Sequence, residues 1–257
     1  NSRRGAAFVS GRPDGMGADV AGTATDVGML QGGFPREANN VIKIGGVRTL
    51  FRMPDLISIG LGGGSLVDLD AGTIGPESVG YRLPERARVF GGPDLTASDL
   101  AVAAGLLSLG DARAVADLSQ GDVARFMGLA STMAAGAVDH MKTEASGVSV
   151  LAVGGGAFLI PDDLPGASEV IRVENGDVAN AVGAAIAQVS GECDQVFTGL
   201  ARDELLQEAR QIAEARAVEG GADAATLKTV EVEDLPLAYL PGNAVRARVR
   251  VVGDIAA

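Results

Sequence analysis

The stretch Asp19-Val-Ala-Gly22-Thr23-Ala-Thr25-Asp26 decides the fold of this chain, because it has the pattern of a tight turn between two strands. One strand is expected to end where the stretch begins, to turn at Gly22, and to return from about Asp26. The turn then presents carboxylates, the hydroxyls of Thr23 and Thr25, and backbone N–H groups uncovered by glycine. A magnesium-bound phosphate requires these groups. The alternative is a polar hairpin in which Asp and Thr have ordinary turn roles.

Two further segments carry consecutive glycines directly after an apolar strand. The run 57–61 leads into Gly62, Gly63, Gly64 and Ser65, and the run 148–153 leads into Gly154, Gly155 and Gly156. A strand that ends in glycines allows a ligand or a second backbone to approach closely. For the first segment, a glycine bulge between two strands remains the alternative.

Composition limits the classes of function. The chain has 257 residues, of which 47% are apolar, enough for one large domain or two small ones with a real core. A net charge of −12 argues against sequence-independent binding of nucleic acid, which needs a basic surface. No apolar run approaches the ~20 residues of a membrane span, so we expect no membrane partner. The single cysteine, Cys193, excludes an intrachain disulfide and suits a cytoplasmic protein.

Apolar periodicity predicts an α/β chain. Residues 3–10 are predicted to form a first strand and residues 75–92 a long loop. Thr96 followed by Asp99 is typical of a capping box that opens a helix as far as Leu107. The strongest helical pattern covers residues 122–144. It contains the only histidine, His140, for which a structural or solvated role is expected.

A second helix is predicted from an N-cap at Asp177 to about Val189. One of its faces carries only small residues, including Ala179 and Gly183, and is suited to lie close against another helix. The character of the chain then changes, and residues 198–257 are predicted to be a small α+β appendage to a domain of residues 1–197.

The last strand of this appendage, residues 245–251, alternates strictly, so that three arginines share one face of a sheet. We expect these arginines to pair with Glu231 and Glu233 on a neighbouring strand rather than to bind nucleic acid. The arginines are Arg246, Arg248 and Arg250.

The order of these motifs resembles the second half of the actin-like ATPase superfamily, which has a ribonuclease H-like α/β fold. In that superfamily the hairpin grips phosphate and the glycine-rich strand end lies against the adenosine. The small-residue helix packs on its counterpart from the other lobe at the hinge.

Four longer strings are similar to the hydantoinase A/oxoprolinase family, whose members are ATP-dependent enzymes that open cyclic amides. The strings are residues 45–55, 60–65, 75–78 and 235–242. The chain lacks one glycine and one threonine of the family hairpin, Asp-Ile-Gly-Gly-Thr-Thr-Thr-Asp. Ala21 replaces the first glycine and Ala24 the middle threonine, changes that narrow the room for phosphate and remove a hydroxyl.

The resemblance implies a role for each candidate residue. Asp19 would hold Mg²⁺, and Asp26 would orient the metal shell, which makes these two the implied catalytic residues. Thr23 and Thr25 would donate to phosphate beside Gly22. The segment 154–156 would support the adenosine of ATP, and the segment 62–65 would lie on the substrate side.

The resemblance also implies partners. Family members carry an earlier lobe with its own phosphate-binding hairpin, and this chain is similar to the C-terminal half alone. The expected partners are therefore the N-terminal lobe of the same protein, a hydantoinase B-type second subunit and a small cyclic-amide substrate. Half of a cleft cannot enclose ATP, so we expect no catalysis by these residues alone. Two other interpretations stay open: a non-catalytic nucleotide-binding or scaffold protein of the same fold, and a small-molecule kinase.

Overall fold

The computed structural model describes residues 1–37, 43–44, 47–48, 54–238 and 240–256. The chain divides into two compact units, Asn1–Ala185 and Ile186–Ala257. The sequence places the domain boundary between residues 197 and 198. In the structure, the strand just before that point, β11 (Val189–Phe197), pairs with β13 (Val245–Gly253) and therefore belongs to the second unit.

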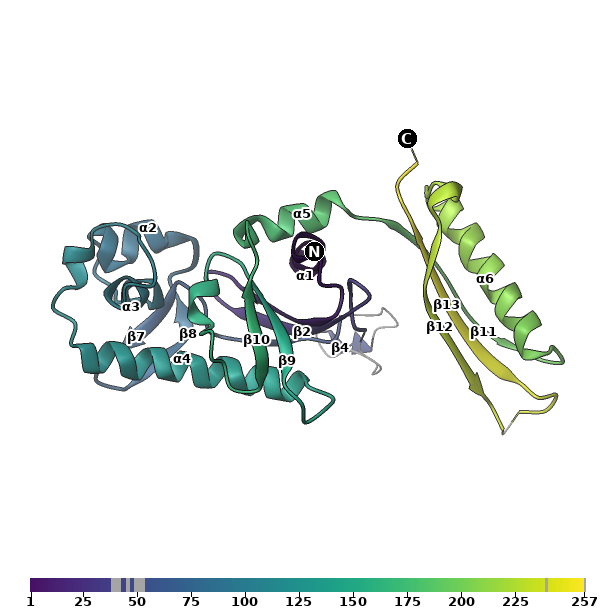
Figure 1. The fold of residues 1–257 in the computed structure, drawn as a ribbon, viewed down its shortest axis with the longest axis horizontal. Helices are drawn as coiled ribbons and strands as arrows, with labels where there is room; N and C mark the ends of the chain where they lie inside the picture. The colour runs from purple at the N-terminus through teal and green to yellow at the C-terminus, as the bar shows by residue number, and fades with distance from the viewer. Residues whose placement is uncertain (38–42, 45–46, 49–53, 239, 257) are drawn as a thin grey trace. The chain divides into compact units, whose positions relative to one another are not determined.

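A six-stranded mixed sheet is the centre of the first unit (Figure 1). Its order is β10-β9-β1-β2-β3, and β6 also pairs with β2. The strands β1, β9 and β10 run parallel, whereas β2 is antiparallel to β1, β3 and β6. Their bounds are Gly15–Val20 for β1, Thr25–Gln31 for β2, Phe34–Pro35 for β3, Ile57–Ile59 for β6, Val148–Val153 for β9 and Ala167–Arg172 for β10.

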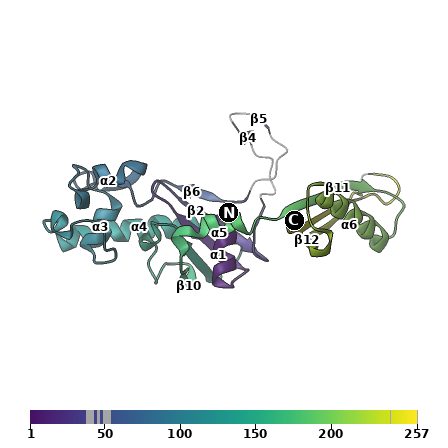
Figure 2. The same ribbon diagram turned by 90° about the horizontal axis from the view of Figure 1, so that it is seen from above.

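Helices cover both faces of this sheet. The long helix α4 (Gln120–Met141) lies on one face, and α1 (Ser2–Ser10) and α5 (Ala179–Ala185) lie on the other (Figures 1 and 2). The alternation along β1 follows this division, because Met16, Ala18 and Val20 join the core on the α4 side. Gly17 and Asp19 consequently point to the side of α1.

The helix α1 replaces the strand predicted for residues 3–10, so that prediction is wrong. Ala6 and Ala7 are buried, whereas Phe8 and Val9 are exposed, which is the pattern of a helix with one buried face. Gly11 ends the helix with a φ of 66°, in the left-handed region. The apolar run favours a strand by composition, but it lacks the alternation of a half-buried strand.

Small residues bring α1 and α5 into close contact. A Cβ on Gly5 would lie 2.0 Å from the carbonyl oxygen of Ala179, and a Cβ on Gly183 would lie 2.0 Å from that of Asn1. The predicted close packing of the small-residue helix is therefore confirmed, but its partner is α1 of this chain. The helix ends at Ala185 rather than near Val189. Asp177 lies in a 3-10 turn, Gly176–Val178, that precedes it.

The region between β6 and α4 consists of short elements. They are β7 (Ser65–Asp68), β8 (Thr73–Ser78), α2 (Leu83–Arg86) and α3 (Ala97–Ala103), with 3-10 turns at Gly80–Arg82, Arg88–Phe90 and Ala112–Val115. The prediction of a long loop over residues 75–92 is wrong, because a strand, a helix and two 3-10 turns lie there. Each of them is too short to show a hydrophobic period in the sequence. The predicted capping box is confirmed: the N–H of Thr96 donates to Asp99 at 2.7 Å, and the N–H of Asp99 donates to Thr96 at 3.4 Å. The helix that it opens ends before Leu107.

The long helix predicted over residues 122–144 is confirmed as α4. Its buried side is the apolar stripe of the sequence, and His140 is exposed near its end. Two of the strings that resemble the hydantoinase A/oxoprolinase family, residues 45–55 and 235–242, lie partly outside the described residues. The short strands β4 (Lys43–Ile44) and β5 (Val47–Arg48) are described, and they pair with each other.

The second unit is a three-stranded antiparallel sheet in the order β11-β13-β12, with α6 (Arg202–Glu219) across β11 and β13. The third strand, β12, spans Lys228–Pro236. The arginines of β13 lie between acidic residues of both neighbours. Arg248 contacts Glu233 at 3.1 Å, and Arg246 contacts Asp194 at 2.6 Å. The predicted pairing with β12 is thus confirmed for Arg248 and Glu233, whereas the pairing of Arg246 with Asp194 of β11 was not predicted. Among the helices of the described part, none has the length and apolar character needed to cross a bilayer.

Candidate functional site

The predicted hairpin is present, with its tip at residues 21–24. Asp19 faces Asp26 across the two strands, so both carboxylates lie on the α1 side of the sheet. The N–H of Ala21 donates to the carbonyl of Ala24 at 2.9 Å and closes the turn. No residue of the tip has a positive φ, which explains why Ala21 is accepted in a turn where the family has glycine.

The glycine segment after β9 lies directly beside this tip. Because β9 is parallel to β1 and pairs Val153 with Asp19, both strands end at the same edge of the sheet. The N–H of Gly156 donates to the carbonyl of Val20 at 2.9 Å. A Cβ on Gly154 would lie 2.8 Å from a carboxylate oxygen of Asp19. The structure therefore brings together the two segments that the motif order associates with one nucleotide.

The segment 62–65 also reaches the tip, but from behind. The N–H groups of Gly63 and Gly64 donate to the carbonyls of Ala21 and Gly22 at 3.0 and 2.7 Å. A Cβ on Gly62 would lie 2.7 Å from the N atom of Thr23. All four residues of the segment are buried, and the Ser65 hydroxyl accepts a hydrogen bond from the Gly62 N–H at 2.8 Å. A buried segment does not face a substrate, so we assign residues 62–65 to supporting the tip instead.

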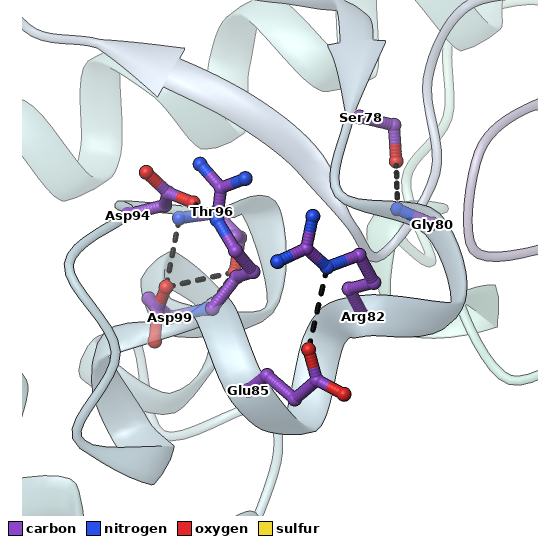
Figure 3. A network of polar contacts seen from close by, with 8 residues as sticks. Ser78, Gly80, Arg82, Glu85, Asp94, Thr96 and Asp99 are labelled. Carbon is purple, nitrogen blue, oxygen red and sulfur yellow. Dashed lines mark hydrogen bonds and ion pairs between the residues drawn. The ribbon is translucent and has the colours of Figure 1, made fainter.

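A third strand end completes this support. The hydroxyl of Ser78 donates to the carbonyl of Gly22 at 3.1 Å. It also accepts a hydrogen bond from the N–H of Gly80 at 3.1 Å (Figure 3). The methyl carbon of Thr23 lies near Gly80, at 3.5 Å from the position of a Cβ there. Figure 3 shows that the turn after Gly80 leads into Arg82, which pairs with Glu85 at 3.3 Å. The tip is thus fixed by neighbours on several sides.

The two threonines of the hairpin differ in availability. Thr25 is fully buried, and its hydroxyl donates to the carbonyl of Leu61 at 2.6 Å. Its proton is committed to the loop, so Thr25 does not supply the phosphate donor expected of it. Thr23 is exposed at the tip and keeps its hydroxyl available.

Backbone hydrogen bonding gives the tip its polarity. Its carbonyls at Ala21, Gly22 and Ala24 accept the bonds described above. Among the described residues, the N–H groups of Gly22, Thr23 and Gly155 donate to no partner. Backbone N–H groups that the fold does not use can bind an anion. These N–H groups lie beside two carboxylates, and a phosphate with a divalent cation needs both kinds of group.

The donor set fits a magnesium ion that shares ligands with a nucleotide. Within the ranges that the structure describes, no group of three or more His, Cys, Asp and Glu side chains could hold a metal by itself. Magnesium is usually bound by one or two carboxylates together with phosphate oxygens and water. Asp19 and Asp26 are both partly accessible, and Asp26 also accepts a hydrogen bond from Ser58. They match that ligand set.

Sequence reasoning missed one charged group at this site, Arg3 of α1. Its side chain crosses Gly17 and Gly28, which face each other one pair behind the two carboxylates. Burial lowers the pKa of Arg3, and the charges of Asp26 and Asp19 act in the opposite direction. The signal in the sequence was faint, because only the strand register reveals that Gly17 and Gly28 form one gap.

Comparisons with solved structures bear on the fold of the chain. Two solved structures share the fold: the nucleotide-free structure of acetone carboxylase, with TM-score 0.62 and 18% identity, and the ATP-dependent caprolactamase from Pseudomonas jessenii, with TM-score 0.68 and 14% identity. They cover 99% and 98% of this chain, whereas the chain spans 48% of each of them. The predicted actin-like ATPase fold is thereby confirmed.

Sequence comparison gives a match to one family model. No curated protein matches the chain. The model of the hydantoinase/oxoprolinase family matches residues 5–112, which include the hairpin and the segment 62–65 behind it. The resemblance inferred from the motifs is therefore confirmed over this part of the chain, where the sequence is similar to the hydantoinase/oxoprolinase family.

Proposed function

We propose that the chain is the C-terminal half of an ATP-dependent enzyme that opens cyclic amides. One observation carries the proposal. The unpartnered amides of the hairpin tip lie beside the carboxylate pair and the end of β9. The family match and the caprolactamase, an ATP-dependent enzyme named for a cyclic amide, support the same reaction class. Because the chain spans about half of each matched structure, the activity is proposed for the parent protein.

Each residue then has a defined task. The N–H groups of Gly22 and Thr23 and the Thr23 hydroxyl bind phosphate oxygens. Asp19 holds the magnesium ion directly or through water, and Asp26 orients its water ligands. The open backbone at Gly155 receives the adenosine. The magnesium ion, when bound, neutralises charge on the transferring phosphoryl group.

The reaction that we propose begins with transfer of the γ-phosphoryl group of ATP to the amide oxygen of the ring, with release of ADP. Water adds to the activated carbon, and the C–N bond breaks to give an amine and an acyl phosphate. A second water hydrolyses the acyl phosphate to a carboxylate and inorganic phosphate. The N-terminal lobe would close the cleft, and a second subunit of the hydantoinase B type would complete the hydrolysis. We place this reaction in the cytoplasm, where ATP is supplied.

ATP hydrolysis by the parent protein with its second subunit tests the proposal. We expect hydantoin, 5-oxoproline or a larger lactam to stimulate release of phosphate, with one ring opened per ATP. Asp19→Asn should lower this rate by 100-fold or more, on the order of the loss from one electrostatic catalytic group. The matched control is Asp14→Asn, at the residue just before β1, where the side chain accepts the Gly32 N–H at 2.8 Å. It should keep most of the activity.

The products separate the rival functions. A stable phosphorylated product would identify a kinase. Stimulation by a ketone and bicarbonate, but by no cyclic amide, would point to a carboxylase like the acetone carboxylase neighbour. Binding of ATP without turnover under any of these conditions would favour a scaffold. Each of these results would overturn the cyclic-amide assignment.

A further inference from the structure

Two facing glycines leave a space on one face of the sheet, and this space holds an arginine near the carboxylates proposed to bind the metal. Gly17 and Gly28 pair across β1 and β2, directly behind the pair Asp19 and Asp26 and on the same face. A Cβ on Gly17 would lie 2.5 Å from Cγ of Arg3, and one on Gly28 would lie 1.8 Å from its Nη1. Any other residue in either position would displace this side chain, so the gap is shaped for it.

The arginine is held there by packing rather than by hydrogen bonds. Its Nη1 atom is buried and has no hydrogen-bond partner among the described residues. Leaving such a donor unpaired is costly, and an account of the fold must explain it. The charges of Asp26 and Asp19 act on Arg3 and offset part of the cost. Arg3 in turn offsets the repulsion between two carboxylates that face each other across the strands.

The position excludes direct contact with the phosphates. Two residues of a strand rise by about 7 Å, so the guanidinium lies roughly that far behind the carboxylates. The tip that would bind phosphate lies beyond Asp19 and Asp26 in the opposite direction. Arg3 therefore acts on the site through its charge.

We propose that Arg3 is the resident counter-cation of Asp19 and Asp26, so that a divalent cation binds there only together with the phosphates of a nucleotide. This proposal rests on the proposed function and adds that the divalent cation binds together with the nucleotide and not before it. A divalent cation alone would meet a fixed positive charge about 7 Å away, which weakens its affinity roughly tenfold even in a water-like dielectric. The phosphates of ATP supply the negative charge that compensates. Arg3 is thus a positioning residue and makes no contact with the reacting atoms.

Binding of Mn²⁺ to the parent protein, followed by electron paramagnetic resonance, tests this inference without any turnover. In Arg3→Met the unbranched stem still packs over Gly17 but the charge is lost. We expect Mn²⁺ alone to bind this variant about tenfold more tightly than the wild type. Arg3→Lys keeps the charge and should stay within about threefold of the wild type. The matched control is Arg4→Met, since Arg4 lies on the same helix with its guanidinium over the ring of Phe34, 4.5 Å from the centroid.

The wild type provides a second readout in case Arg3→Met fails to fold. Its affinity for Mn²⁺ should rise at least tenfold when a non-hydrolysable ATP analogue is present. Tight binding of Mn²⁺ to the wild type without nucleotide, or equal Mn²⁺ affinities for Arg3→Met and Arg4→Met, would overturn the role of Arg3. Asp19→Asn keeps the two proposals distinct: if it leaves Mn²⁺ and nucleotide binding unchanged, the proposed site itself is wrong.

Discussion

Gly154 and Gly155 are neighbours in the sequence but have different reasons to be glycine. Gly154 has a φ of 87°, and a Cβ there would lie 2.3 Å from the carbonyl oxygen of Val20. At Gly155 an added Cβ would meet no atom within 4 Å, and its φ is not positive. The fold therefore requires glycine at the first position and leaves open space at the second, where a ligand can approach.

Substitution by alanine should separate these two requirements. Gly154→Ala should lower the free energy of unfolding of the first unit by about 1–3 kcal/mol, because it strains the backbone and crowds β1. Gly155→Ala should leave the unfolding free energy unchanged and weaken ATP binding. Urea denaturation and calorimetric titration with Mg-ATP measure the two effects. Unchanged nucleotide affinity in Gly155→Ala would remove the adenosine from this loop.

The hairpin threonines allow a similar comparison. Thr25→Val removes a buried hydroxyl and leaves the carbonyl of Leu61 without its donor, so we expect a loss of about 1–3 kcal/mol in urea denaturation. Thr23→Val lies at the exposed tip and should leave stability nearly unchanged while it weakens Mg-ATP binding. If Thr25→Val weakens Mg-ATP binding and Thr23→Val lowers stability instead, Thr25 and not Thr23 contacts the ligand.

At this scale the sequence predicted part of the site. Asp19, Gly22 and Thr23 could be predicted because the residues of a hairpin tip are contiguous in the chain. The buried role of Thr25 could not be predicted, since it depends on a carbonyl supplied by Leu61. Arg3 was missed for the same reason: its position becomes meaningful only when the register of β1 and β2 is known.

At the scale of elements, packing between a helix and a sheet depends on single glycines in both units. In the second unit a Cβ on Gly191 of β11 would lie 2.0 Å from the carbonyl oxygen of Ala213 in α6. Cys193, two residues further along the same face, is buried beneath that helix, and burial raises the pKa of its thiol. The thiol should therefore react only when α6 and β11 separate.

Labelling of Cys193 by a disulfide reagent measures this packing. We expect slow labelling of the native protein at pH 8 and complete labelling in denaturant. Gly191→Ala should raise the native rate about tenfold or more, because the new methyl group collides with the backbone of α6. Ser190→Ala, at the neighbouring exposed position, is the control and should leave the rate unchanged. Rapid labelling of the wild type would mean that α6 does not cover this strand.

The charge-paired face of the same sheet predicts a dependence on pH. Hydrogen bonds from Arg246 lower the pKa of Asp194 in the folded state. Its stabilising effect is therefore present above the unfolded pKa of about 3.9 and is lost as the pH falls through the folded value. Asp194→Asn should cost about 1 kcal/mol at pH 7 and progressively less below pH 4. Urea titrations followed by circular dichroism at each pH measure this difference.

The control for this titration is Glu219→Gln at the end of α6, where the carboxylate forms no ion pair among the described residues. A cost of Asp194→Asn that stays constant from pH 7 to pH 2 would contradict the assignment.

Elements long enough to repeat their hydrophobic pattern several times could be predicted from the sequence. Short elements that are held in place by tertiary contacts could not. The 22 residues of α4 repeat their apolar stripe often enough to identify a helix. The nine residues of α1 repeat it barely twice, and their apolar run was mistaken for a strand. The elements of residues 75–92 are held by bonds such as that from Ser78 to Gly22, which no local pattern indicates.

At the scale of the whole molecule, the proposed nucleotide site depends on one convergence of strand ends. The parallel pair β1 and β9 brings Asp19 and Val153 side by side, although 133 residues separate them in the sequence. The resemblance in motif order could predict this convergence because strand ends of a parallel pair meet at one edge. The sequence could not predict that α1 closes against α5 within the chain, since that contact follows from Gly5 and Gly183 in three dimensions.

A structure of the parent protein with Mg²⁺ and a non-hydrolysable ATP analogue tests this convergence most directly. We expect phosphate oxygens within hydrogen-bond distance of the Gly22 and Thr23 N–H groups, with Mg²⁺ at Asp19 and the adenosine against Gly155. A nucleotide bound elsewhere, with the hairpin tip and the segment 154–156 both unliganded, would contradict it.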